Sequence, residues 1–145
     1  DEALLLSSDI RALIEHNRER LLARYIKGVG TLSLTIDEHG VRYSFEAPNT
    51  ADGDYAVEMV GRGDISGSSF AFRVKDSDTE WKKEGDLWVR TIKRFSLLRD
   101  VTITTDPAYT QTEVSVRSLE EMDKPIEEEK DLPYKVKLQL LRNRI

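Results

Sequence analysis

The segment GDISGSSFAF places two adjacent serines, whose hydroxyls could act as nucleophiles, directly before an aromatic alternation. If it forms a strand, Phe70 and Phe72 point to the core face and Ser69 points to the other face. Ser69 would then leave the core beside the small Ala71, and the preceding glycine would let the backbone come close to a ligand. The pattern fits a serine nucleophile with an open front, and it also fits a turn before an ordinary edge strand. It is not the G-x-S-x-G elbow, so hydrolase chemistry of that type is not indicated.

A serine nucleophile needs a base to take its proton, and histidine is the usual one. The chain has only two histidines. His39 lies in the turn sequence DEHG, where a polar residue is expected in any case. His16 follows an apolar run in LIEHN, so it could lie at the edge of the core, either as a structural residue or as the base. His16 is therefore the candidate base.

A third group, usually a carboxylate, orients the base in a catalytic triad. Asp100 begins the segment DVTITT. If this segment is a strand, Val101 and Ile103 face the core, and Asp100 shares the opposite face with Thr102. An acid at a strand start is also common on plain surfaces. Asp106 is better explained as a turn residue because a proline follows it.

Composition limits the other function classes. The chain has 145 residues, no cysteine and a net charge of -5. An acidic domain gains nothing from counterion release on DNA, so we expect no nucleic-acid partner. No apolar run approaches the roughly 20 residues of a membrane span, so we expect no membrane association. Two isolated histidines without cysteine make no metal-ligand spacing, and we expect no metal or other cofactor.

The chain must position these groups mainly with strands. Alternation at period two predicts a hairpin over residues 31–46, and Asp52 or Asp54 could cap a short helix that Gly61 and Gly63 close. Further strands are expected at residues 70–74, 86–98 and 100–105, with a polar loop at residues 75–85. Residues 8–25 fit a helix or a strand. Short strands at this density favour a β-barrel or a sandwich.

The C-terminal part has a different character. Residues 118–131 are strongly acidic and predict a linker or a frayed helix. Residues 134–145 could form an amphipathic helix. We therefore expect a domain over residues 1–117, an acidic linker over residues 118–133 and a C-terminal helix over residues 134–145.

Five segments in a fixed order resemble the prohead (capsid maturation) proteases of tailed phages. They are DIRALIEHN, GTLSL, GVRYSFEAP, GDISGSSFAFRV and LLRDVTITTDPAYTQTEVSVR, and the resemblance runs from about Asp1 to Arg117. The chain departs from the family pattern in three places. EHN stands where the family usually has NHD, and SFAF stands where it has SFGF. The glycine-rich first strand that the family usually has would lie ahead of Asp1. Without that strand a barrel would have an open edge, which another part of the chain, a neighbour or residues ahead of Asp1 would fill.

The resemblance implies a mainly β fold with a few helices (α+β), similar to the β-barrel of the herpesvirus assembly protease. It implies a serine endopeptidase with Ser69 as nucleophile, His16 as base and Asp100 as orienting acid, and it implies no cofactor. The implied substrates and partners are the major capsid protein, its scaffolding region and other copies of the protease, with self-cleavage. The implied location is the assembling prohead in the cytoplasm of the bacterial host. The alternative is a non-catalytic β-barrel that serves as a scaffold or interaction module.

Overall fold

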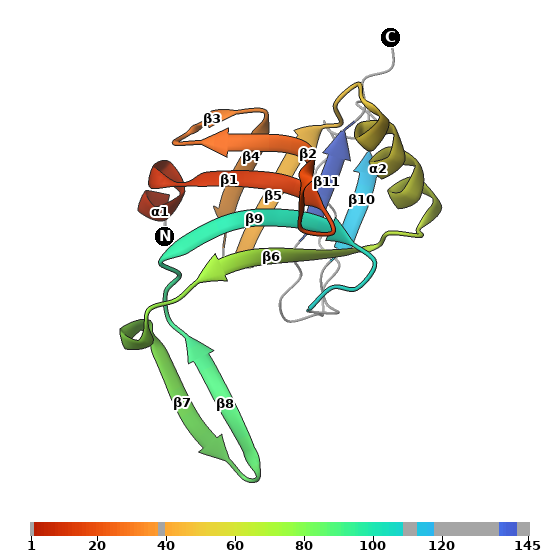
Figure 1. Cartoon of the computed structure of the whole chain (residues 1–145). Helices are drawn as coiled ribbons and strands as arrows, with labels where there is room; N and C mark the ends of the chain where they lie inside the picture. Colours follow the sequence, from red (N-terminus) through yellow and green to blue (C-terminus); the bar gives the residue numbers. More distant parts are fainter. Residues whose placement is uncertain (1, 38–39, 109–112, 118–136, 142–145) are drawn as a thin grey trace.

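The strands of the molecule form two larger sheets and one separate hairpin (Figure 1). The structure is a computed structural model, and it describes residues 2–37, 40–108, 113–117 and 137–141. Within these ranges, two short α-helices accompany the strands. The expectation of a mainly β, α+β fold is therefore confirmed.

The first sheet has five strands, in the order β3-β2-β1-β9-β6. Strand β9 lies between β1, to which it runs parallel, and β6, to which it runs antiparallel. Strands β3 and β6 form the two edges. The strands of this sheet are β1 (Asp9–Ile14), β2 (Asn17–Ile26), β3 (Val29–Gly30), β6 (Gly67–Arg73) and β9 (Leu97–Thr104).

The N-terminal segment that fitted either a helix or a strand forms an antiparallel hairpin of β1 and β2. It follows the short helix α1 (Glu2–Ser7). Ile10, Ile14 and Leu22 had suited a helical face, but they are buried from strands instead. Pairing with β2 on one side and β9 on the other makes β1 the central strand of the sheet, and these tertiary contacts override the local pattern.

The second sheet has four strands, in the order β10-β11-β5-β4. The predicted hairpin over residues 31–46 is confirmed as the antiparallel pair β4 (Leu32–Asp37) and β5 (Gly40–Glu46). Strands β10 (Glu113–Arg117) and β11 (Lys137–Leu141) complete the sheet, and β11 pairs with both β10 and β5. The C-terminal helix expected over residues 134–145 is therefore wrong at residues 137–141. Alternation in KVKLQL also has the period of a strand.

The expected short helix is α2 (Ala51–Arg62). Its N-cap is Thr50, whose hydroxyl accepts a hydrogen bond from the Gly53 amide, and not Asp52 or Asp54 as expected. Gly63 ends it in the left-handed conformation, as predicted. No helix among the described residues is long and apolar enough to cross a membrane.

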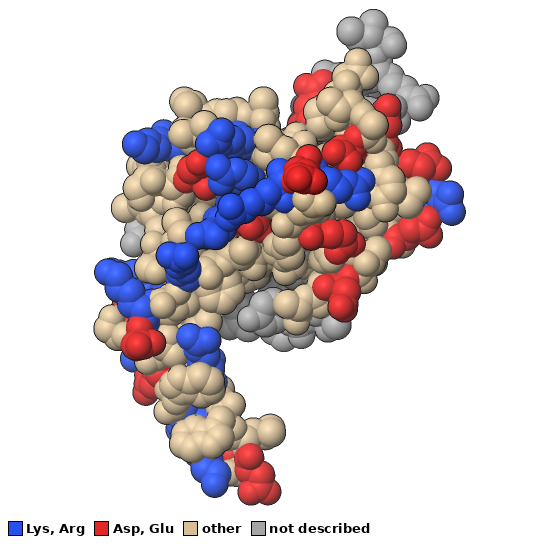
Figure 2. Space-filling view, viewed as in Figure 1, with Lys and Arg blue, Asp and Glu red and all other residues tan. Residues whose placement is uncertain are grey.

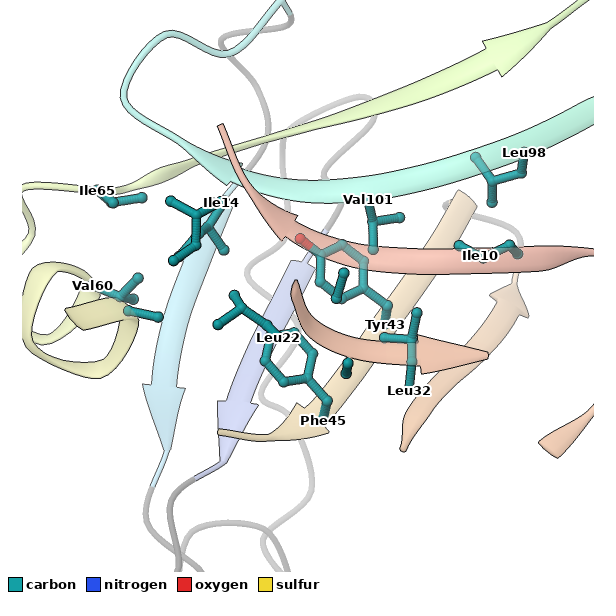
Figure 3. Close-up of a cluster of buried hydrophobic side chains, with 14 of the residues drawn as sticks. Ile10, Ile14, Leu22, Leu32, Tyr43, Phe45, Val60, Ile65, Leu98 and Val101 are labelled. Carbon is teal, nitrogen blue, oxygen red and sulfur yellow. The ribbon is translucent and has the colours of Figure 1, made fainter. Parts of the chain in front are cut away.

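The hydrophobic core lies where the inner faces of the two sheets meet α2 (Figure 3). Each sheet has two open edges among the described strands, so the described part of the chain forms no closed barrel, and the barrel expectation is corrected to two packed sheets. The fully buried members include Ile10, Leu32, Ile65 and Ile103. Val101 and Ile103 contribute the inner face of β9, as predicted. The opposite face of β9 is therefore free to carry polar groups.

The third sheet is a hairpin that extends from the body between β6 and β9 (Figure 1). It follows a short 3-10 turn, η1 (Asp76–Asp78), and consists of β7 (Thr79–Glu84) and β8 (Leu87–Ile92). The polar loop predicted over residues 75–85 is wrong, because it contains β7. The single strand predicted over residues 86–98 is two strands, β8 and the start of β9.

Candidate active site

The outer face of β9 carries the polar groups that the alternation predicted. Asp100 is 5 % exposed and Thr102 is completely buried. On the neighbouring strand β6, Ser69 pairs with Thr102, and Ala71 pairs with Asp100. Residues directly opposite each other on paired strands point to the same face, so Ser69 shares the outer face with Asp100 and Thr102.

His16 reaches this face from a tight turn. Glu15 and His16 connect β1 to β2, and both have positive φ angles, 52° and 54°. Positive φ at both central residues is the requirement of a type I′ hairpin turn. The His16 amide donates a hydrogen bond of 3.0 Å to the Thr102 hydroxyl, which in turn donates to the Leu13 carbonyl. Thr102 therefore fixes the backbone of the turn against β9.

The imidazole of His16 is hydrogen-bonded to Asp100. The distance between His16 Nδ1 and Asp100 Oδ1 is 2.6 Å. The Asp100 side chain is 7 % exposed, whereas the His16 side chain is 41 % exposed. A proton on Nδ1 that faces the carboxylate leaves Nε2 as the acceptor nitrogen of the neutral ring. In this tautomer, Asp100 accepts a hydrogen bond from Nδ1, and Nε2 is able to accept a proton, as in a histidine base oriented by an acid.

Ser69 lies one strand away from the pair, beside Thr102, and its residue exposure is 7 %. Ser69 is therefore less exposed than the sequence analysis expected for a nucleophile that is open to substrate. Among the described residues, the structure has no hydrogen bond between the Ser69 hydroxyl and the His16 ring. The structure thus joins two of the three predicted site residues directly and places the third on the same face.

Ser68 is distinct from Ser69 in its surroundings. It pairs with Ile103 and points to the core side, where its hydroxyl lies 3.1 Å from the Tyr43 hydroxyl and donates to the Thr102 carbonyl at 2.9 Å. Burial raises the pKa of the Tyr43 phenol far above its usual range, and the nearby Asp100 charge adds to the increase. Ser68 is therefore a buried hydroxyl whose partners Tyr43 and Thr102 satisfy it on the core side.

Glu15 holds the other side of the turn. Its carboxylate accepts hydrogen bonds from the hydroxyl of Thr104 and from the amide and hydroxyl of Thr105. Partial burial alone would raise the pKa of Glu15, but these three hydrogen bonds outweigh it and lower the pKa. The Glu15 amide also donates to the Ile103 carbonyl. The turn that carries His16 is thus attached to the C-terminal end of β9.

Sequence reasoning missed the positioning roles of Glu15 and Thr102. The only available signal was the alternation of threonines in DVTITT, which placed Thr102 beside Asp100 without indicating its hydrogen bonds. Among the described residues, no cluster of histidine, aspartate and glutamate could hold a metal ion. His39 lies outside the described residues.

A histidine paired with a buried carboxylate, with a serine on the next strand of the same face, is the set of groups used by serine hydrolases. A family model described as caudovirus prohead serine protease matches residues 1–125. The chain therefore belongs to the caudovirus prohead serine protease family. No curated protein and no solved structure matches it.

Proposed function

We propose that this chain is an active serine endopeptidase in which Ser69 is the nucleophile, His16 the general base and Asp100 the orienting acid. The observation that carries the proposal is the 2.6 Å hydrogen bond between His16 and Asp100, on the sheet face that also bears Ser69. Family membership supports the same chemistry. No cofactor takes part.

In the proposed reaction, Ser69 Oγ attacks the carbonyl carbon of the scissile peptide bond, and its proton passes to His16 Nε2. Asp100 holds the proton on Nδ1 and stabilises the imidazolium that forms. Collapse of the tetrahedral intermediate breaks the C–N bond, and the imidazolium gives its proton to the leaving amine. A water molecule, deprotonated by the same histidine, then hydrolyses the acyl-enzyme and regenerates the Ser69 hydroxyl.

The mechanism does not require a hydrogen bond between Ser69 and His16 while the site is empty. Catalytic hydrogen bonds are often long in empty sites and tighten only when substrate binds. The His16 ring is the most exposed of the three groups, and it is attached at the tip of a two-residue turn. The His16 amide is hydrogen-bonded to Thr102, the residue that pairs with Ser69, so both groups adjoin the same position of β9. The mechanism requires His16 Nε2 and Ser69 Oγ to come within hydrogen-bond distance when substrate binds.

The substrates that we propose are the major capsid protein and its scaffolding region, cleaved inside the assembling prohead in the bacterial host. Membership of a prohead protease family supports interaction with capsid proteins. Self-cleavage belongs to the same proposal, with the acidic stretch before Pro133 as a candidate site. The proposal also includes that the fold of this chain is similar to that of the herpesvirus assembly protease.

The decisive experiment compares two adjacent serines. The chain is co-expressed with its capsid precursor, and processing is followed by mass spectrometry for Ser69→Ala, Ser68→Ala and the unchanged chain. We expect Ser69→Ala to abolish processing. Ser68→Ala removes a buried hydroxyl, so it lowers stability, but the folded fraction keeps the activity. Circular dichroism reports the folded fraction of each variant.

An active-site-directed phosphonate supplies a readout that does not depend on the substrate. We expect the phosphonate to modify Ser69 in the unchanged chain and to modify His16→Ala far more slowly. Labelling of Ser68 instead would move the nucleophile by one residue. A folded chain that neither reacts with the phosphonate nor processes the precursor would indicate a non-catalytic scaffold or interaction module.

A further inference from the structure

The hairpin of β7 and β8 exposes large apolar side chains away from both sheets. It extends clear of the body in Figures 1 and 2. Trp81 is 58 % exposed, Trp88 is 65 % exposed and Leu87 is 73 % exposed. A two-stranded hairpin without a partner is marginally stable in water, and exposed indoles add no burial to stabilise it. Clustered apolar exposure of this kind marks an interaction site.

The two faces of the hairpin differ in chemistry. The register pairs Trp81 with Arg90 and Lys83 with Trp88. These four residues therefore lie on one face, which we call the Trp–cation face. The Arg90 guanidinium lies 5.5 Å from the centre of the Trp81 ring. Among the described residues, neither Lys83 nor Arg90 pairs with a carboxylate.

The opposite face is balanced in charge. Lys82 pairs with Glu84 at 3.3 Å, and Glu80 pairs with Lys93 at 2.7 Å. The pairing with Lys93 lowers the pKa of Glu80, chiefly through the hydrogen bond. All carboxylates of the two strands are thus on the face away from the tryptophans. The two cations of the Trp–cation face have no described carboxylate beside them, so they are available to carboxylates of a partner.

The chemistry of this face specifies a partner that is both acidic and apolar. Tryptophan and arginine are the residues most enriched where interfaces concentrate their binding energy. Carboxylates would complement the two cations, and aliphatic side chains would pack well on the indoles. A nucleic acid is a poor candidate, because the chain carries a net charge of -5 and this face offers only two cations.

The sequence of the chain itself contains a segment of this composition. Residues 118–131 have seven carboxylates against two lysines, and among the acids stand three apolar residues, Leu119, Met122 and Ile126. We propose that the Trp–cation face of one molecule binds the segment 118–131 of a second copy. Its carboxylates pair with Lys83 and Arg90, and its apolar side chains pack on Trp81 and Trp88. The proposal is independent of the catalytic roles assigned above.

The test measures self-association of the full chain carrying Ser69→Ala, which prevents proposed self-cleavage during the measurement. We expect sedimentation to show concentration-dependent association that weakens as salt is added. Lys83→Glu should weaken association about tenfold, because it places a like charge opposite the acids. Lys82→Glu is the matched control, since it makes the same charge change on the other face and should leave association unchanged.

A charge exchange identifies the two surfaces. A chain with Glu127→Lys, Glu128→Lys and Glu129→Lys should not associate with the unchanged chain's Trp–cation face, but it should associate with the variant Lys83→Glu/Arg90→Glu. A synthetic peptide of residues 118–131 should change the tryptophan fluorescence of the unchanged chain and compete with self-association.

Three results would overturn the proposal. One is a chain that stays monomeric at all concentrations and does not bind the peptide. A second is equal loss of association in Lys82→Glu and Lys83→Glu. The third is a monomer whose Trp–cation face binds only the capsid precursor, which would assign the face to a separate protein.

Discussion

His16 meets two structural requirements at the scale of a single residue. Its backbone must adopt positive φ in a two-residue turn, and its ring must reach Asp100 across the neighbouring strand. Positive φ is uncommon for residues other than glycine, and such positions are often found at functional sites. Two hydrogen bonds hold the turn in place against this cost: the His16 amide donates to the Thr102 hydroxyl, and the Glu15 carboxylate accepts from the Thr104 hydroxyl.

Asp100→Asn should reduce turnover by a factor on the order of 10⁴, by analogy with the removal of the orienting carboxylate in other serine peptidases. The asparagine amide can donate to Nδ1, which would favour the tautomer that has its proton on Nε2 and cannot accept from Ser69. Because the change acts on the base, we expect kcat to fall with little change in KM. Steady-state kinetics on a short peptide substrate measure both.

Asp106→Asn provides the control, because it changes the same functional group on an exposed residue shortly after the same strand. It should leave kcat unchanged. A fully active Asp100→Asn enzyme would remove the orienting role from Asp100, while equal losses in both variants would indicate a general effect of charge.

Local pattern predicted the sheet face on which Ser69 and Asp100 lie, but not the contacts of the candidate site. Alternation placed Ser69 on the face opposite Phe70, and Asp100 on the face opposite Val101, and the strand register agrees with both. The hydrogen bond between His16 and Asp100 joins residues 84 positions apart in the chain, and no local period encodes it. The resemblance to a known family, not the pattern, suggested that pairing.

At the scale of elements, the turn between β1 and β2 depends on Glu15. Glu15→Gln should destabilise the fold by about 1 kcal/mol at neutral pH, a small value because the side chain is exposed and its hydrogen bonds are screened by water. Activity should fall as well, because the turn carries His16. Chemical denaturation and peptide hydrolysis measure the two effects.

The effect of Glu15 on stability should depend on pH. Its pKa is lowered in the folded state, so the carboxylate contributes stability above its ordinary pKa of about 4.3, and this stability is lost as the pH falls through the lowered value. The difference between Glu15→Gln and the unchanged chain should therefore disappear in acid. Glu19→Gln, on the next strand and with no such hydrogen bonds, should show no difference at either pH. A difference that persists in acid would contradict the linkage.

The start of β6 depends on the absence of a side chain at Gly67. A Cβ built there would lie 2.6 Å from Pro107 Cγ and 3.0 Å or less from two further ring atoms. The proline ring cannot bend away, so Gly67→Ala should cost about 1–3 kcal/mol. It should also lower activity, because Ser69 is two residues away on the same strand. Thermal unfolding and peptide hydrolysis test both expectations.

Gly61→Ala is the matched change at a site with open space. A Cβ at Gly61 meets nothing within 4 Å, and the residue lies in the helix α2. We expect this change to stabilise the chain by about 0.5–1 kcal/mol, since alanine loses less conformational freedom in a helix. Equal stability of the Gly67→Ala and Gly61→Ala variants would show that packing against Pro107 does not require glycine at position 67.

Strands with one buried face could be predicted from the sequence, whereas strands with both faces exposed could not. The hairpin of β4 and β5 alternates clearly because Leu32, Tyr43 and Phe45 reach the core. Strand β7 has the sequence TEWKKE, and five of its six residues are exposed. Without a buried face there is no apolar alternation to detect, so its sequence looks like a polar loop.

The arrangement of the whole molecule depends on pairings between distant segments. Strand β9 runs parallel to β1, and β11 runs parallel to β5. Such pairs join segments far apart in the sequence, so they cannot be inferred from adjacent hairpins. The sequence therefore indicated a β-rich fold, but it did not indicate which strands share a sheet. It also suggested one long strand where the chain leaves the body to form the β7–β8 hairpin.

The β7–β8 hairpin should be separable from the body that carries the candidate active site. Residues 76–93 contribute no buried residue, and the strands that flank them meet where Arg73 pairs with Leu97 and the Ser96 amide donates to the Arg73 carbonyl at 2.8 Å. Replacing residues 76–93 with a short glycine–serine linker should therefore change the free energy of unfolding by less than about 1 kcal/mol.

This shortened chain separates catalysis from association. Hydrolysis of a short peptide should persist, because His16, Ser69 and Asp100 all lie on the five-stranded sheet or its turn. Self-association measured by sedimentation should be lost, because the Trp–cation face is removed. Loss of peptide hydrolysis in a folded shortened chain would show that the hairpin supports the active site. Undiminished association would place the contact between copies on the body, where the described surface has no comparable exposure of two tryptophans beside two unpaired cations.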